Sequence, residues 1–428
     1  MDLRTVVFLV FTVRGNVAKI PVTITGIGML NALGIGRSTY WHQLLKATPG
    51  IARIQGFDTD KYASNLGAEI QGFEAKDFMS PRFYRRLSRL SRLAVAASIE
   101  AIEDSGLEIS DQNRHRIGVV FGTAFGSTNQ TDAFFVSLLD HGPQAAEPIL
   151  FPDTVPNAPT SHVAMYHRLH GPNSTFCQNH LSGECALAYG LSLLEQDQAD
   201  VVVVGGVDEL SSILFHSLDS VRALKPIHQQ KPLLTSHFPT GKGFIPGEGA
   251  TCIVLERTDV PARQPRNTYG TVLSLQLTSG VSNQGHYEVD GKAMAEGLRA
   301  ALKEAKIEAK DIGILGLAAN GVDELERGEA LALEEVFGRQ WQQIPRIPIR
   351  YFVGEFGSGG LLTAATILLS LAEGTVPPTV QGPELTGLAG KSRRFAPVKK
   401  EPLVAGIAIG STFGGGSACI IFGRQQGK

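Results

Sequence analysis

The segment at residues 199–209 reads ADVVVVGGVDE, and it decides the fold class of the chain. Its centre, Val201–Gly205, is an unbroken β-branched run that ends in glycine, which predicts a buried strand. A helix over Ser182–Gln196 and a short strand at Ser174–Cys177 precede it. Strand, helix and strand in this order form a βαβ unit, so the segment predicts a layered α/β fold.

The same alternation continues on both sides of this unit. Further strands are predicted at Val22–Thr25 (followed by a turn carrying Gly26 and Gly28), Ile117–Gly122, Ile312–Leu317, 403–409 and 418–422. Helices are predicted over 81–106, 129–139, 292–305, Glu324–Phe337 and 361–373.

The polar, proline-containing stretch TDVPARQPRN at 258–267 predicts a linker. Because the pattern starts again after it, we expect an extension at 1–20 and two duplicated halves, 21–257 and 258–428.

Composition excludes several classes of protein. The 428 residues are 43% hydrophobic and 19% charged, which is typical of a globular chain. The net charge of -2 argues against a nucleic-acid binder. Four cysteines are too few for a disulfide framework and lack metal-site spacing, so we expect a cytoplasmic protein without a metal. The apolar run Thr5–Val13 ends at Arg14 and is too short to span a membrane.

Several motifs, in order along residues 21–428, resemble the β-ketoacyl-acyl-carrier-protein synthases. They are VTITGIGML (22–30), DSGLEI (104–109), RIGVVFGTAFG (116–126), GPNSTFCQNHLSG (171–183), ADVVVVGGVDE (199–209), GFIPGEGATCIVLE (243–256), VPPTV (376–380) and STFGGGSACIIF (411–422). The resemblance is greatest to type II condensing enzymes and type II polyketide ketosynthase subunits. It implies the thiolase-like five-layered αβαβα fold, most often found as a dimer.

The resemblance also implies a catalytic set that this chain lacks. The family places a cysteine at a helix N-terminus in a TACxSG-like motif, and two histidines in AHGTxT-like and KSxxGH-like motifs. Aligned on Ser182–Gly183, His180 stands at the cysteine and Asn320 at the first histidine. Counting back from VPPTV puts Ile349 at the lysine and Gly354 at the second histidine, a register that the sequence alone leaves open.

Two counts support this loss without any alignment. The last histidine of the chain is His286, and no lysine lies between Lys310 and Lys391. A C-terminal histidine pair with its lysine is therefore absent.

The residues that would shape an acyl pocket are retained better than the reactive ones. The resemblance places Phe413, Gly414 and Gly415 in the family's gating FGG segment and Phe125 at the wall of the acyl tunnel. It also places Asn129 and Phe134 on the helix from which partner subunits control chain length. A retained pocket without a nucleophile resembles the chain length factor of type II polyketide systems.

Several residues keep more than one interpretation open. His180 could polarise a thioester, or it could simply fill the pocket of the missing nucleophile, since no partner base is visible. Cys177 or Cys185 could act as a nucleophile in a shifted register, although buried cysteines usually behave as small hydrophobes. Of the arginines at helical spacing, Arg82, Arg85, Arg86 and Arg89 could dock an acidic carrier protein, or they could form an ion-paired surface.

The sequence as a whole predicts a ketosynthase-like subunit that pairs with an active β-ketoacyl synthase in polyketide or fatty-acid-like biosynthesis. Its partners would be that ketosynthase and an acyl carrier protein, whose phosphopantetheine carries the substrates, with no other cofactor. An active acyltransferase that uses Cys177 or His180 is the alternative, and a stand-alone carrier-binding module is a third interpretation.

Overall fold

The structure is a computed structural model that describes residues 20–233, 239–259, 267–378, 398–399 and 403–424. Residues 1–19 of the predicted extension, most of the predicted linker and the stretch after Pro378 in which VPPTV ends lie outside the described residues.

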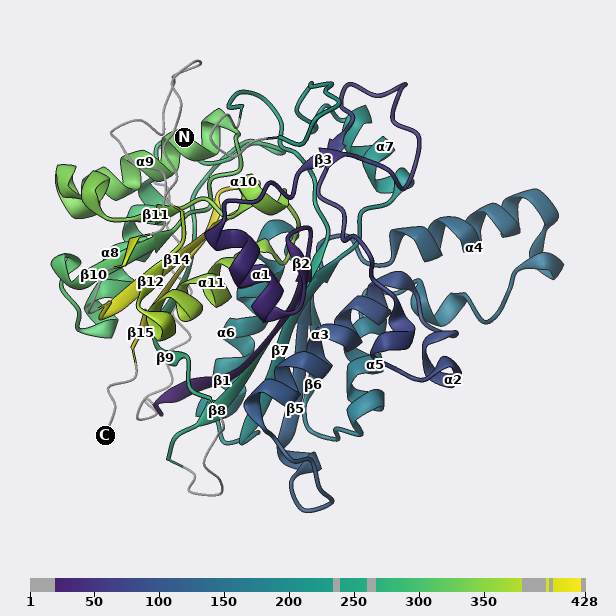
Figure 1. Ribbon diagram of the computed structural model, residues 1–428, viewed down its shortest axis with the longest axis horizontal. Coiled ribbons are helices and arrows are strands. Elements are labelled where there is room, and N and C mark those ends of the chain that lie inside the picture. The colour runs from purple at the N-terminus through teal and green to yellow at the C-terminus, as the bar shows by residue number, and fades with distance from the viewer. Residues whose placement is uncertain (1–19, 234–238, 260–266, 379–397, 400–402, 425–428) are drawn as a thin grey trace, which may run out of the picture.

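One mixed sheet joins eleven strands of the described residues (Figure 1). Its order is β11-β10-β14-β15-β9-β1-β8-β7-β5-β6, and β2 pairs with β1. The strands are β1 (Val22–Asn31), β2 (Gly34–Ile35), β5 (Ile117–Gly122), β6 (Asn173–Phe176), β7 (Val201–Asp208), β8 (Gly249–Arg257), β9 (Gly270–Ser279), β10 (Ile312–Gly316), β11 (Arg346–Ile347), β14 (Ala405–Ser411) and β15 (Gly416–Gly423). Short pairs form β3 (Ala52–Arg53) with β4 (Leu66–Gly67), and β12 (Thr375–Val376) with β13 (Val398–Lys399).

The strand pairing follows one pattern in both parts of the sheet. In the first part β5 runs parallel to β6 and β7, while β7 pairs antiparallel with β8 and β8 with β1. In the second part β10 runs parallel to β11 and β14, while β14 pairs antiparallel with β15 and β15 with β9. The second part therefore repeats the order and directions of the first, and β1 with β9 joins the two.

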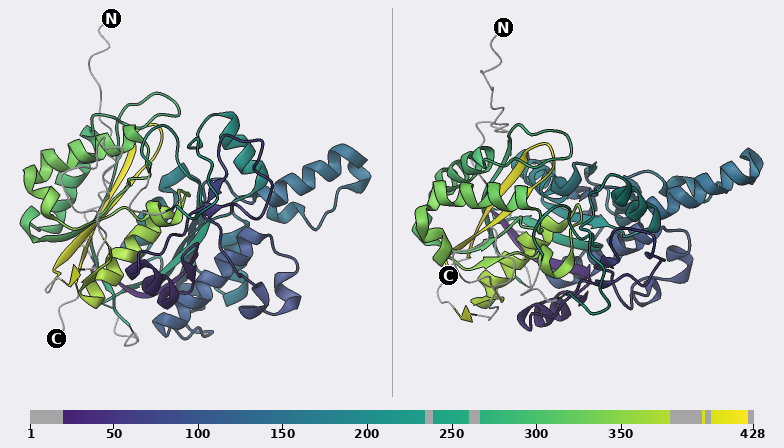
Figure 2. Two further views of the ribbon diagram at one scale, coloured as in Figure 1. Left: turned by 45° about the horizontal axis from the view of Figure 1, so that its top comes forward. Right: turned by 90° about the horizontal axis from the view of Figure 1, so that it is seen from above.

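Helices cover both faces of this sheet and also separate its two parts. The longer helices are α1 (Arg37–Leu45), α3 (Arg89–Ser105), α4 (Thr128–His141), α5 (Ala158–His167), α6 (Ser182–Glu195), α7 (Ser212–Ser220), α8 (Lys292–Ala305), α9 (Asp323–Phe337) and α11 (Gly359–Glu373). Helix α3 packs on β1 and β8, α8 packs on β9 and β15, and α6 and α11 pack together between the two parts of the sheet (Figure 2). The layers follow the αβαβα order predicted.

Two local predictions were wrong, and both failures have a packing cause. The predicted helix over 81–106 is broken into α2 (Pro81–Tyr84) and α3, because Ser88 is buried and caps α3 with its hydroxyl. Gly26 and Gly28 lie inside β1 rather than in a turn. A Cβ at either glycine would collide with backbone carbonyls of α3, so glycine here permits close helix–strand packing.

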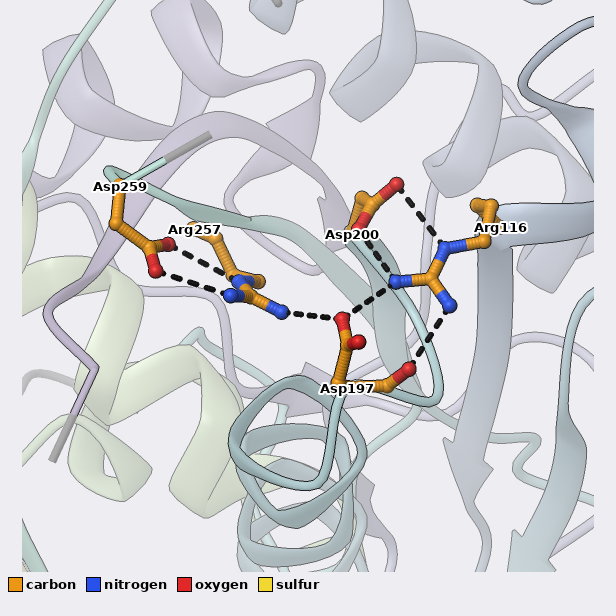
Figure 3. A network of polar contacts seen from close by, with 5 residues as sticks. All are labelled: Arg116, Asp197, Asp200, Arg257 and Asp259. Carbon is orange, nitrogen blue, oxygen red and sulfur yellow. Dashed lines mark hydrogen bonds and ion pairs between the residues drawn. The ribbon is translucent and has the colours of Figure 1, made fainter. Parts of the chain in front are cut away.

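A network of charged residues holds the ends of neighbouring strands together (Figure 3). Arg116, next to β5, binds both Asp200 and Asp197 with its Nη2 at 2.7 Å. Arg257, at the end of β8, reaches the same Asp197 at 2.6 Å and Asp259 at 2.9 Å. The turn between α6 and β7 is thereby fixed to its neighbours.

Helix α4 is a long element that departs from the layers. Figures 1 and 2 show it projecting from the body as an arm, and every apolar side chain it carries is at least partly exposed. Within the described ranges, no helix is long and apolar enough to cross a membrane.

Candidate functional site

His180 lies just before α6, at the position where the family resemblance places the nucleophilic cysteine. The preceding Asn179 has φ 47, a left-handed conformation that turns the chain sharply into the helix. Ser182 fixes this turn, because its hydroxyl accepts from Gln178 N at 2.9 Å and donates to Asn179 O at 2.6 Å. The imidazole is 1% exposed, and burial lowers the pKa of His180, so the ring is neutral.

A chain of hydrogen bonds runs from His180 into the second half of the molecule. The Tyr287 hydroxyl lies 3.3 Å from His180 Nδ1, and Asn320 Nδ2 donates to the Tyr287 oxygen at 3.1 Å. The same Nδ2 donates to Glu355 Oε2 at 2.8 Å. The Tyr287 oxygen therefore links the Asn320 amide to the His180 imidazole.

A buried ion pair ends this chain. Arg350 Nε lies 3.2 Å from Glu355 Oε1, and both side chains are almost completely buried. Arg350 Nη1 also donates to Leu317 O at 3.1 Å and to Thr363 Oγ1 at 3.2 Å. The guanidinium is thus held by Glu355, Leu317 and Thr363 in the interior.

Two further carboxyl groups accompany Arg350. Burial raises the pKa of Glu184 to about 7 and that of Glu329 to about 8. Glu184 lies against Gly360 and Gly410, whose missing side chains leave it room. Glu329 accepts from the backbone N–H groups of Ala318 and Ala319 at 2.6 and 3.1 Å. The interior around Arg350 is therefore rich in carboxyl groups.

Aromatic rings close the site from outside. Phe413 packs on Tyr287 and His180 with ring centroids 4.6 and 5.2 Å apart, and Phe244 lies edge-on to His180 at 5.4 Å. The glycines after Phe413 allow this placement, since Gly414 and Gly415 both have φ 85. The backbone N–H of Gly414 donates to His286 O at 3.0 Å.

The contacts favour a register one residue later than predicted for the KSxxGH-like motif. Ile349 is an apolar core residue, and Gly354 supplies only backbone, with φ 70. Glu355, in contrast, accepts hydrogen bonds from both Asn320 and Arg350. In this register RYFVGE places a basic residue at the lysine and a carboxylate at the histidine. Tyr287, in contrast, has no signal in the sequence, and Phe244 lies in the motif at 243–256 but is not predicted as a site residue.

Neither candidate cysteine has the environment of an activated nucleophile. The Cys177 thiol is exposed, yet partial burial and the charge of Asp208 raise its pKa. Burial raises the pKa of Cys185 to about 12. A catalytic thiol needs a lowered pKa, so the electrostatics disfavour both. Among the described residues, no group of His, Cys, Asp or Glu is arranged to hold a metal ion.

The predicted pocket residues are spread along the base and length of α4. Phe125 is 37% exposed just before the helix, and Phe134 packs on Phe135 and Phe151 along the arm. Asn129 lies at the wall of a cavity of about 430 Å³. The cavity is lined by Gln55, Gly56, Phe57, Glu69, Ile70, Gln71, Arg89, Asn129, Leu210, Ser211, Ser212 and Glu248. The structure does not bring Phe134 to this cavity.

The arginines predicted to dock a carrier protein fall into two groups: some are bound to other residues, and the others are exposed. Arg89 is taken up by Glu248, with Nη2 2.6 Å from Oε1, and Arg92 donates to Tyr84 O at 3.0 Å. Arg82, Arg85 and Arg86 are exposed. These last three form what we call the arginine patch.

Known families match almost the whole described chain. The profile named beta-ketoacyl synthase, N-terminal domain, matches residues 19–260, and that named beta-ketoacyl synthase, C-terminal domain, matches residues 269–382. The chain belongs to the β-ketoacyl synthase family.

Two relatives match this β-ketoacyl synthase homologue over nearly their full length. The tetracenomycin polyketide synthase ketoacyl synthase alpha subunit of Streptomyces glaucescens is 28% identical over 422 residues, covering 96% of this chain and 98% of the relative. A 3-oxoacyl-[acyl-carrier-protein] synthase 2 of Vibrio cholerae is 25% identical over 414 residues, covering 95% and 100%.

Solved structures confirm the thiolase-like ketosynthase fold. The ishigamide ketosynthase/chain length factor matches with a TM-score of 0.83 and 23% identity, covering 96% of this chain and all 100% of that one. A ketosynthase in complex with its chain length factor from Xenorhabdus doucetiae matches with a TM-score of 0.74 and 22% identity, covering 95% and 98%.

Proposed function

We propose that this β-ketoacyl synthase homologue is a chain-length-factor subunit that has lost the condensing reaction and pairs with an active ketosynthase in the cytoplasm. The observation that carries the proposal is the chain from His180 through Tyr287 and Asn320 to Glu355. These polar groups bind one another, so they are not directed at a thioester. The substrates would be carried on the phosphopantetheine of an acyl carrier protein, with no other cofactor.

The chemistry of the site supports this proposal. Condensation needs a thiolate to hold the acyl chain and imidazoles to polarise the carbonyl of the malonyl thioester. Here a neutral, buried imidazole stands at the thiol position and a carboxylate stands beside Asn320. Glu355 is itself taken up by Arg350 and Asn320, so it offers a substrate carbonyl no hydrogen-bond donor. His180 therefore acts as a pocket-filling residue rather than a nucleophile.

The surface supports an extended contact with another subunit. Strand β6 ends the path of the sheet within the described residues, with β5 on its inner side. The arm exposes Phe135 at 50% and Leu139 at 80%, and Phe151 beside it is 58% exposed. Large apolar side chains gathered on one projection mark an interaction surface. An active ketosynthase would cover the sheet edge and the arm together.

The arginine patch supports docking of an acyl carrier protein. Arg85 and Arg86 follow α2 and Arg82 lies in it, so the three charges share one short exposed segment. An acidic carrier protein would be attracted to this segment over about one Debye length, roughly 8 Å in physiological salt.

The experiment that tests the proposal is intact-protein mass spectrometry of the chain co-expressed with a ketosynthase that has a TACxSG motif. After incubation with malonyl- and acyl-carrier-protein thioesters, we expect an acyl adduct on the ketosynthase and none on this chain. An adduct on this chain that disappears in Cys177→Ala or His180→Ala would overturn the proposal. It would establish an active acyltransferase instead.

A further inference from the structure

The arm has little apolar packing along its length and is held at its base. Helix α4 begins directly after Ser127, and none of its residues is fully buried. In Figure 1 the chain turns at the tip of this helix and runs back toward the body. The return segment, residues 142–153, ends in the short 3₁₀ helix Phe151–Asp153. Because apolar burial contributes little here, the contacts at the two ends of the arm set its direction.

Asp153 connects the return segment to two helices of the body. Its side chain is almost completely buried, and its Oδ1 lies 2.5 Å from Nε2 of His162 in α5. Its Oδ2 accepts from Ser88 N at 2.6 Å and from Ser91 Oγ at 3.0 Å, both at the start of α3. Burial by itself raises the pKa of Asp153, but the hydrogen bonds from His162 and Ser88 outweigh it and lower the pKa. The carboxylate is therefore charged at neutral pH, which strengthens all three contacts.

A chain of hydroxyl groups joins the start of the arm to the same carboxylate. Ser127 Oγ donates to Ser88 Oγ at 3.1 Å, and Ser88 Oγ donates to Ser91 Oγ at 3.1 Å. Ser91 Oγ in turn donates to Asp153. The three serines are at most 3% exposed, so water does not compete for these hydrogen bonds. Both ends of the arm therefore meet at one buried carboxylate.

A second carboxylate holds only the first turn of α4. Glu209, buried directly after β7, accepts from Asn129 N at 2.8 Å and lies 3.4 Å from Thr128 Oγ1. This contact fixes the point from which the arm starts. A rod that is held at one point can still swing, and a second attachment is needed to fix its direction. Asp153 supplies that second attachment through α3 and α5.

We propose that Asp153 is a positioning residue that fixes the direction of the arm before any partner binds. The identity of the partner rests on the proposed function, in which the arm contacts an active ketosynthase. With Asp153 in place, the arm loses little conformational freedom on association, which lowers the cost of binding. Without Asp153, Glu209 would still hold the first turn of α4, while the return segment would come free of α3 and α5.

Hydrogen exchange of the full chain alone, measured by mass spectrometry, tests the attachment. In Asp153→Asn we expect the amides of the return segment to exchange about tenfold faster, because a buried charged acceptor is lost. The amides of β7 and β8 should keep their rates. The matched control is Asp140→Asn, which removes an exposed carboxylate from α4 itself and should leave the return segment unchanged.

Ser127→Ala is a milder test that does not depend on how well the Asp153 variant folds. It removes the hydroxyl group that joins the start of the arm to Ser88, and leaves Asp153 in contact with α3 and α5. We expect a smaller increase of exchange, confined to the arm. Unchanged exchange of the return segment in Asp153→Asn would overturn the inference. An increase spread evenly over the whole chain would also overturn it, because it would show a general loss of stability.

The Kd for a purified active ketosynthase separates this inference from the proposed function. We expect a complex about tenfold weaker for Asp153→Asn than for Asp140→Asn, since a loosened arm has to be ordered on binding. A return segment that exchanges faster in Asp153→Asn while the Kd stays unchanged would contradict the arm contact of the proposed function. The role of Asp153 in fixing the arm would then still stand.

Discussion

The Asn320 amide and the Glu355 carboxylate face each other across 2.8 Å in the interior. Asn320 stands where the family resemblance places one catalytic histidine, and Glu355 directly follows the position predicted for the other. Neither group can polarise a carbonyl as an imidazole does while it is bound to the other. The contact instead joins the loop after β10 to the segment before α11. Residues at positions where the family resemblance places catalytic histidines thus hold the interior together.

Replacement of Glu355 should destabilise the protein. Glu355→Gln leaves the Arg350 guanidinium buried without its partner, and breaking a buried pair on one side costs about 3 kcal/mol. We expect a matching loss in the free energy of unfolding measured by urea denaturation. The control is Asp60→Asn, which breaks the exposed pair with Arg53. A loss no larger than that of the control would contradict the interior role of Glu355.

Stability should fall as pH rises through neutrality. The folded pKa of Glu184, about 7, and of Glu329, about 8, exceed the ordinary glutamate value of 4.5. Between the unfolded and folded pKa values the folded state holds more protons, so its stability is greatest on the acid side and decreases up to about pH 8. Each group contributes a slope of at most about 1.4 kcal/mol per pH unit.

Glu184→Gln isolates one of these groups. We expect a shallower decline of the unfolding free energy between pH 5 and 8 and a variant more stable than the natural protein at pH 8. Denaturation curves across this interval measure both effects. An unchanged slope would show that Glu184 is ionised in the folded state at acid pH.

A restored thiol alone should not restore catalysis. His180→Cys places a sulfur under Phe413, next to Tyr287 and without an imidazole base among the residues described in the site. Burial without a base raises a thiol pKa, so we expect no acyl adduct by mass spectrometry at neutral pH. The comparison is the triple variant that combines His180→Cys with Asn320→His and Glu355→His. An adduct on the single variant would show that the site keeps an activating environment.

The arm should be needed for association and dispensable for folding. Leu139→Asp puts a charge on a side chain that is 80% exposed, so the isolated chain should fold normally by circular dichroism. In size-exclusion chromatography with a co-expressed ketosynthase, we expect the complex to be lost. Val221→Asp, at a side chain 74% exposed at the end of α7, is the control. An equal loss of the complex in both variants would show that the arm is not the surface that binds the ketosynthase.

Charge reversal in the arginine patch should weaken binding of an acyl carrier protein. Arg85→Glu with Arg86→Glu is expected to raise the Kd about tenfold at low salt, with less effect at high salt, because exposed charges are screened. Arg339→Glu, exposed in the second half of the chain, should change little. Surface plasmon resonance at two salt concentrations measures the Kd of each variant for the carrier protein. A salt-independent loss would point to disrupted folding.

The sequence alone determined the layered fold and showed that no histidine follows His286. An apolar run such as Val201–Gly205 favours a strand buried inside a sheet. The position of the last histidine, His286, can be read directly from the sequence. Local signals of this kind do not depend on the rest of the chain. The resemblance that spans the whole sequence also placed His180, Asn320 and Phe413 in one site.

Only the tertiary structure decided which side chains meet His180 and Asn320. Tyr287 and Glu355 lie 107 and 175 positions after His180 in the chain, yet packing of α6 against the second half brings them into one hydrogen-bonded chain. The break before Ser88 and the position of Gly26 inside β1 were likewise set by contacts with distant elements. Contacts between residues so far apart in the sequence depend on how the layers of the fold pack. The periodicity of the sequence does not predict that packing.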